Sequence, residues 1–400
     1  MLGAIIVLTA LQLVPLPPAM WQSLPARDVI ARIDYAAGLG DIWRPLTMTP
    51  GRTANALAAM IVPLTALLLA LATRMSARNL LVIIAWIAVM NFVLGMMQIV
   101  NPGNGNLFFY SITNPGTAVG IFANNNHAAV LSACAMLIFT RLAIEDAEAR
   151  SPSPWLLVFV TGAVAMFFSA IVNGSRAGFI AALVGSLTAA AMTWVMWSRR
   201  GKKLDRHSPV KNRSYKGALI AGGLVAFIAA LLATLSFAGN LDALDRLSDD
   251  SALQDVRVGL LPILRQMATA LWFTGSGFGS FELVYHVFEP DSMLASHVIN
   301  QAHNDWVQLV IEGGLVAALL LLALMIWIAR SIIRLIRAPQ VAGWLPLFWT
   351  GTFAIIAFAS LVDYPMRAPT FTAVAVFLLI VLMRDATEAG RFRDNGVARH

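Results

Sequence analysis

"LVAALLLLALMIWIA", residues 315–329, is an unbroken apolar run, and the residues just before it extend it to a length that crosses a bilayer as a helix over 306–329. Directly before the run stands "QAHNDWVQLVIEGG", residues 301–314, which carries His303, Asn304, Asp305 and Glu312. Polar groups at the start of a membrane helix must face protein or water, because lipid offers them no partners. This junction therefore predicts both a membrane fold and a candidate functional site.

The rest of the chain repeats the apolar pattern. Of its 400 residues 58% are hydrophobic and 12% are charged. The predicted spans are 1–15, 53–73, 79–100, 119–140, 154–172, 178–197, 217–237, 306–329, 343–362 and 369–383. A bilayer offers no hydrogen-bond partners to backbone N–H and C=O groups. Each span is therefore expected to be an α-helix, which pairs these groups internally. The sequence thus predicts an all-α, polytopic transmembrane helix bundle, a single integral membrane domain over 1–400 with about ten spans.

The first span is unusual because it follows Met1 without a charged segment. We expect a short or incomplete span there rather than a cleaved signal peptide. The single cysteine, Cys134, excludes a disulfide within the chain.

Basic residues indicate the orientation of the chain. All four lysines and most arginines fall in alternate loops, above all in the basic loop 198–216, and arginines also occupy the tail 384–400. The positive-inside rule places these segments and both termini in the cytoplasm, and it makes 238–303 a larger periplasmic loop. The net charge of +7 is then a topology signal, and we expect no nucleic-acid partner.

Ionisable residues are almost absent inside the predicted spans, where only Glu312 and His127 of "FANNNHAAV" stand out. An ion-coupled transporter normally needs acids or bases at mid-depth, so that class is disfavoured. The other candidates lie at the predicted outer ends of the spans. They are Arg176, Arg257, Arg265, His303, Asp363 and Arg367.

Simpler roles stay open for the arginines. Arg176 lies in a turn between two spans and can snorkel to lipid headgroups. Arg257 and Arg265 are eight residues apart, which puts them roughly 80° apart on a helix, so both can face one anion or simply face water.

The polar residues of 301–314 have a helical spacing. If this stretch is one helix, five side chains fall within an arc of about 100°, a stripe that must face protein or water. They are Gln301, Asn304, Asp305, Gln308 and Glu312. His303 lies about 100° outside the arc, so it precedes the helix or meets another neighbour. Helix N-capping by Asn304 or Asp305 is the simpler role, but it leaves Glu312 unexplained.

Two further motifs are weak. "GSGFGSF", residues 275–281, lacks the Lys-Ser/Thr of a phosphate-binding loop and the strand–helix unit around it. The spacings between His286, His297 and His303 match no usual zinc pattern. We expect no metal and no cofactor.

Taken together, the motifs resemble one family. "AHNDWVQLVIEGG" is similar to the His-Asn and Glu-x-Gly signature of the bacterial O-antigen ligase and polymerase superfamily. Four further segments agree in order: "IFANNNHAAV", "NGSRAGF", "VRVGLLPILRQMATALWFTGSGFGSF" and "LVDYPMRAP". The resemblance extends from about Pro15 to Arg384 and includes "VPLPPAMWQSLP" and "WRPLTMTP". One departure is Leu261, beside Pro262, where the family has a tryptophan.

The resemblance implies a C-type glycosyltransferase fold, with a large periplasmic loop before the helix that bears the histidine. Such enzymes transfer a glycan from undecaprenyl pyrophosphate to an acceptor hydroxyl without metal. The implied partners are that donor, a lipid A-core or glycan acceptor, and membrane lipids. The implied location is the bacterial inner membrane, with the active site facing the periplasm.

The resemblance also implies roles for residues. His303 is the expected catalytic base, and Arg176 and Arg257 match the family's functional arginines, with Arg265 as a further candidate for the donor pyrophosphate. The expected supporting residues are Asn304, Asp305, Glu312, Asp363, Arg367 and His127. Transfer to lipid A-core, a ligase reaction, is narrowly favoured. An O-antigen or exopolysaccharide polymerase, a protein O-oligosaccharyltransferase and a non-catalytic transporter of lipid-linked glycans are the alternatives.

Overall fold

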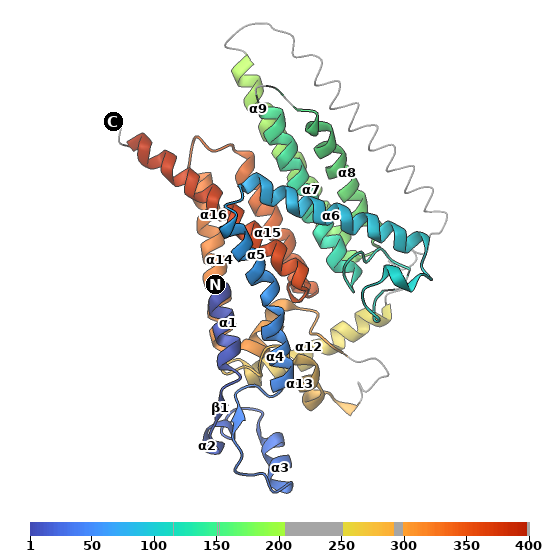
Figure 1. Cartoon of the computed structure of the whole chain (residues 1–400), viewed down its shortest axis with the longest axis vertical. Helices are drawn as coiled ribbons and strands as arrows, with labels where there is room; N and C mark the ends of the chain where they lie inside the picture. Colours follow the sequence, from blue (N-terminus) through green and yellow to red (C-terminus); the bar gives the residue numbers. More distant parts are fainter. Residues whose placement is uncertain (115, 150, 152, 205–250, 292–298, 398–400) are drawn as a thin grey trace. The chain divides into compact units, whose positions relative to one another are not determined.

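The structure is a computed structural model. It describes residues 1–114, 116–149, 151, 153–204, 251–291 and 299–397, and for 200–204, 251–258 and 392–397 it describes the backbone alone. Helices make up most of this part of the chain (Figure 1). Its two strands, β1 (Pro15–Leu16) and β2 (Arg44–Pro45), form one short antiparallel pair.

Eight helices in the described ranges are long and apolar enough to cross a membrane. They are α4 and α5 (Pro50–Ala59 and Ile61–Ala72, together one span), α6 (Ala77–Val100), α7 (Asn125–Glu148), α8 (Trp155–Val172), α9 (Arg176–Leu204), α14 (Asp305–Ile336), α15 (Trp344–Val362) and α16 (Pro369–Val397). The all-α, polytopic helical fold is therefore confirmed.

The first predicted span, 1–15, is shorter in the structure than predicted, and the seventh, 217–237, is not tested. The first, 1–15, forms only α1 (Leu2–Leu11), whose ten residues extend about 15 Å, half the thickness of the hydrocarbon core. The predicted span at 217–237 lies outside the described residues.

Residue contacts divide the chain into two compact units. The first unit comprises Met1–Leu68, Ser251–Ile328 and Ser360–Ala373, and the second comprises Leu69–Asp250, Ala329–Ala359 and Val374–His400. That they form one membrane domain, as the sequence predicts, stays a prediction.

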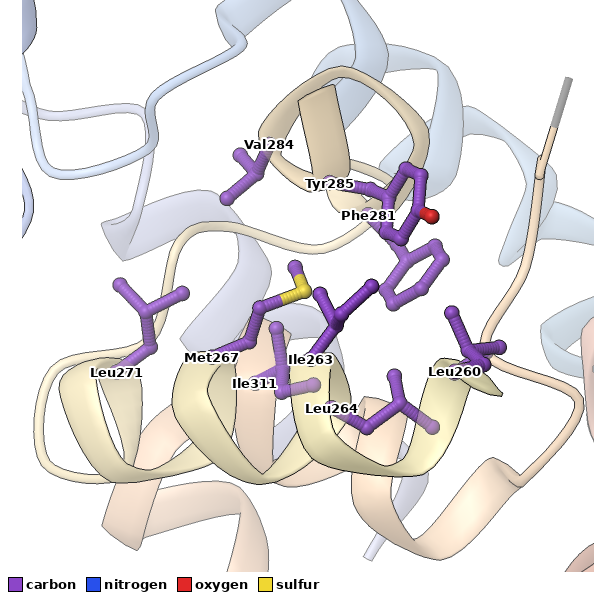
Figure 2. Close-up of a cluster of buried hydrophobic side chains, with 10 residues drawn as sticks. Leu260, Ile263, Leu264, Met267, Leu271, Phe281, Val284, Tyr285 and Ile311 are labelled. Carbon is purple, nitrogen blue, oxygen red and sulfur yellow. The ribbon is translucent and has the colours of Figure 1, made fainter. Parts of the chain in front are cut away.

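The predicted 238–303 loop contributes helices to the first unit. They are α12 (Ser251–Leu271) and α13 (Phe281–Phe288). Figure 2 shows leucine, isoleucine and methionine side chains of α12 pointing toward Phe281, Val284 and Tyr285 of α13, with Ile311 of α14 beside them. All of these side chains are at least 95% buried, so they form the core that fixes α12 and α13 against the beginning of α14.

The membrane helix α14 is interrupted at its polar end. Gly314 has φ 62° and ψ −158°, which is not helical, so residues 305–313 and 315–336 are two helical segments. The backbone N–H of Leu315 donates to the carbonyl of Phe273 instead of continuing the helix (3.2 Å). The predicted span 306–329 is therefore interrupted, and the condition of one helix over 301–315 is not met, since the helix begins at Asp305 and breaks at Gly314.

The second unit is built around α7, which is almost entirely buried. The predicted span 119–140 is shifted, because α7 starts at Asn125 and continues past Arg141 to Glu148. Arg141, expected in a cytoplasmic loop, is buried within the helix, and its Nη1 lies 2.7 Å from an Asp385 carboxylate oxygen on α16. This pairing lets a charged residue lie inside a packed helix, which hydropathy alone does not anticipate.

Candidate active site

The first unit places His303 just before α14, in a strained backbone conformation. Its φ is 48°, a left-handed value that is uncommon for residues other than glycine. Asn304 caps the helix, since its Oδ1 accepts from the N–H of Val307 (3.0 Å). The N-cap role considered for Asn304 is thereby confirmed, and His303 lies outside the helix.

Gln308 ties the stretch before the helix to the helix itself. Its Oε1 accepts from the N–H of Ala302 (2.9 Å), and its Nε2 donates to the side chains of Gln301 and Glu312. Because Gln308 is buried, these bonds are shielded from water. They fix the residues on the N-terminal side of His303.

Asp363 lies beside the imidazole ring of His303. Its carboxylate is buried and lies 3.4 Å from Nδ1 of His303, while its carbonyl accepts from the N–H of Asp305 (3.2 Å). The ring of Tyr364 contacts the imidazole edge to face, with centroids 5.0 Å apart. The His303 side chain is 30% exposed and its Nδ1 is buried, so the ring presents its other edge outward.

Arg367 lies between two acids of α14. Its Nη1 pairs with Glu312 Oε2, and its Nε lies 3.7 Å from Asp305 Oδ1. Burial by itself would lower the pKa of Arg367, but the two carboxylates raise it above its ordinary value. The guanidinium is therefore a permanent cation that bridges the start of α14 to the turn after α15.

Glu312, which the helical stripe left unexplained, is fully buried and fully bonded. Besides Arg367, its carboxylate accepts from the backbone N–H of Phe281 (3.2 Å) and from Gln308 (3.1 Å). A buried carboxylate is tolerated when it is paired in this way. Glu312 thus joins α14, α13 and the 365–367 turn.

The glycine-rich turn of residues 275–279 closes the broken end of α14. The N–H groups of Ser276 and Gly277 donate to the carbonyls of Ile311 and Glu312, both at 2.9 Å. These carbonyls are the acceptors that a helix leaves open at its C-terminus. The motif that resembled a phosphate loop is therefore engaged with protein.

The segment after α1 supports this turn from the other side. Gln12 donates to the Glu312 carbonyl and accepts from the N–H of Phe278, both at 2.9 Å. Arg27 is buried and donates to the carbonyls of Leu46 (2.6 Å) and Gly275 (3.3 Å). Burial lowers the pKa of Arg27 to about 10. Sequence reasoning missed Gln12 and Arg27, although a glutamine inside the apolar 1–15 run was a usable signal.

Arg257 and Arg265 both belong to α12. The backbone alone is described at Arg257. Arg265 is exposed, and within the described ranges no carboxylate lies within ion-pair distance of it. The structure thus places the two arginines on one helix of the unit that holds His303.

Arg176 and His127 lie in the second unit. Arg176 is the first residue of α9, and Ser175 caps that helix by accepting from the N–H of Gly178 (2.9 Å). His127 is buried in the first turn of α7 and contacts Phe122 edge to face. The side chain of Asn125 donates to the carbonyl of Asn173 (2.8 Å), which joins "FANNNHAAV" to "NGSRAGF".

In the described part of the chain, no group of three His, Cys, Asp or Glu side chains is arranged to hold a metal ion, and His297 lies outside it.

Six of the residues expected from the sequence lie together in the structure. They are His303, Asn304, Asp305, Glu312, Asp363 and Arg367.

Part of the chain is similar to a known protein family. Residues 161–322 match the family described as O-antigen ligase, and this range includes Arg176, Arg257 and the His303 segment. No curated protein matches the chain. The match over residues 161–322 supports the resemblance to the O-antigen ligase superfamily, and the eight long apolar helices indicate a multi-pass membrane protein.

Proposed function

We propose that the protein is an O-antigen ligase-like glycosyltransferase of the bacterial inner membrane. It transfers a glycan from undecaprenyl pyrophosphate to a hydroxyl of lipid A-core at the periplasmic face. The observation that carries this proposal is His303, held outside its helix with Nδ1 against buried Asp363. The family match supports the reaction class.

In the proposed step, the acceptor oxygen attacks the anomeric carbon of the glycan. A new carbon–oxygen bond forms as the bond from that carbon to the pyrophosphate oxygen breaks, and undecaprenyl pyrophosphate leaves with the electron pair. His303 takes the hydroxyl proton on Nε2, because Nδ1 faces Asp363. The carboxylate orients the ring and stabilises the imidazolium that forms.

The leaving pyrophosphate gains negative charge, which fixed cations stabilise. Arg176 and Arg257 are the proposed ligands, because a guanidinium offers a planar, multidentate fork to phosphate oxygens. No metal is required in this scheme. Arg265 remains a further candidate on the family resemblance.

The remaining charged residues position the base. Arg367, Asp305 and Glu312 lock the start of α14 to the 365–367 turn, two residues after Asp363. We infer that this network sets the distance between His303 and Asp363. It acts through the histidine and does not touch the substrate.

A gene deletion followed by gel analysis of the surface glycan tests this function. Lipid A-core without attached polymer is the result expected for a ligase. Single repeat units on the core would instead identify a polymerase. A surface glycan identical to that of the parent strain would contradict both.

A further inference from the structure

Large apolar side chains are exposed on α12 and just past its C-terminal end. The inner side carries the core residues that contact α13, whereas Leu261 on another side is 60% exposed. Just past the helix end, Trp272 and Phe273 are 51% and 60% exposed. Their rings contact each other edge to face, with centroids 5.5 Å apart. Three large apolar side chains in water are costly, so a partner is expected.

A hydrogen bond fixes the depth of this surface. The carbonyl of Phe273 accepts from the N–H of Leu315, the first residue of the apolar run 315–329. That run is the apolar part of α14, a helix long and apolar enough to cross a membrane. The end of α12 therefore lies where α14 enters the bilayer, at the level at which tryptophan is enriched in membrane proteins.

Charge distinguishes a lipid partner from a purely apolar one. Arg265 is one helical turn from Leu261, exposed, and without a carboxylate within ion-pair distance in the described ranges. Gln266 and Thr269 are exposed on α12 as well. Exposed leucine, tryptophan and phenylalanine side chains beside an arginine and other polar side chains are typical of a helix that lies in the membrane interface.

We propose that α12 lies on the outer surface of the membrane, with Leu261, Trp272 and Phe273 inserted at the level of the acyl–headgroup boundary and Arg265 on a lipid phosphate. The contact fixes the height of α12 above the bilayer. It would hold the helix that carries Arg257 at the depth where a lipid-linked pyrophosphate emerges, and it does not depend on which acceptor is used.

Depth-dependent quenching tests this placement. The full chain, with Cys134 replaced by alanine, would receive a single cysteine as Leu261→Cys, Trp272→Cys or, as the matched control on the same helix, Gln266→Cys. Each variant carries a bimane label in liposomes of phosphatidylethanolamine and phosphatidylglycerol. We expect headgroup-labelled nitroxide lipid to quench positions 261 and 272 several-fold more than position 266, and iodide to show the opposite order.

Equal iodide quenching at all three positions would overturn the proposal, because the surface would then face water. Protection of position 261 from both quenchers would overturn it in favour of a protein partner. Adding Arg265→Glu to the Leu261→Cys variant should lower its lipid quenching in both phosphatidylcholine and phosphatidylglycerol liposomes, and more in the latter, because the net negative charge of phosphatidylglycerol also repels the new carboxylate. Equal quenching with and without Arg265→Glu would refute the phosphate contact.

Discussion

At the scale of single residues, His303 combines a left-handed backbone with a buried acidic neighbour. A non-glycine residue at φ 48° costs free energy and persists only where its surroundings hold it. Here Gln308 fixes the chain before it, Asn304 caps the helix after it, and Asp363 holds its Nδ1 side. A strained backbone of this kind is typical of functional sites. With Nδ1 buried, the other edge of the imidazole faces outward.

The proposed donor arginines should not tolerate lysine. Arg176→Lys and Arg257→Lys keep the charge but replace a planar fork by a point charge on a flexible stem. We expect each variant to lose donor binding and turnover, by roughly 1.5–3 kcal/mol, the usual value of a hydrogen bond to a charged group. Binding and single-turnover assays with purified protein measure both. Arg334→Lys, an exposed control near the far end of α14, should keep wild-type values, and equal losses in the control would refute the assignment.

The sequence predicted the residue types of the site better than their contacts. It identified His303, Asp363 and Arg367 as outer-face candidates. It could not show that Arg367 meets Glu312, because the two are 55 residues apart and no periodicity links residues on different helices. Arg27 and Gln12 escaped for the same reason, since their partners lie 248 and 300 residues away.

At the scale of elements, the decisive feature is the break in α14. The apolar pattern predicted one continuous span over 306–329, although two consecutive glycines, Gly313 and Gly314, lie inside it. The structure instead uses Gly314 to end one helical segment, which leaves carbonyls for the glycine-rich turn. The polar residues 305–312 thereby belong to a short segment packed in protein, and the apolar run begins after the break.

Gly314→Ala should disrupt this junction. Its φ and ψ are accessible almost only to glycine, and an added Cβ would lie 2.6 Å from the Phe273 carbonyl oxygen and 2.7 Å from the Gly275 nitrogen. We expect a loss of at least about 2 kcal/mol, seen as a lower apparent unfolding temperature in detergent. Gly51→Ala is the matched control, since nothing lies within 4 Å of its added Cβ. Equal unfolding temperatures for the two variants would contradict the proposed break.

Glu312→Gln tests the link between α14, α13 and the 365–367 turn. The change leaves Arg367 with Asp305 alone and should destabilise the protein by about 1–3 kcal/mol. Turnover should fall less than in His303→Ala, because Glu312 supports the site without touching the substrate. Glu282→Gln removes a half-exposed pair with Arg52 and should change the unfolding temperature little. A Glu312→Gln protein as stable as Glu282→Gln would show that the buried link contributes nothing.

At the scale of the whole molecule, the distribution of lysine and arginine predicts which side of the membrane each loop faces. Thiol labelling from outside intact spheroplasts should reach Thr269→Cys on exposed α12. It should not reach Ser208→Cys in the basic loop 198–216 until the membrane is made permeable. Cys134 is buried and should contribute no background. Labelling of position 208 from outside would reverse the orientation and remove the proposed site from the periplasm.

Composition alone predicted the membrane fold. It did not predict where a helix ends when a charged side chain is paired within the protein. Hydropathy ended the span of α7 at residue 140, but the pairing of Arg141 with Asp385 lets the helix continue through the charged stretch. At the N-terminus the apolar run ended in a turn and β1 rather than a full crossing. Both differences arise from contacts between distant segments, which a local pattern does not contain.

The most direct test of the proposed transfer reaction compares His303→Ala with wild type in a purified system. The donor is a glycan on undecaprenyl pyrophosphate, the acceptor is lipid A-core, and donor binding and turnover are measured separately. His286→Ala, at an exposed histidine of α13, is the control and should keep wild-type turnover. We predict that His303→Ala binds the donor nearly as wild type while turnover falls by a factor on the order of 10² to 10⁴, the usual contribution of a general base. A His303→Ala protein that is folded, inserted and fully active would contradict the account.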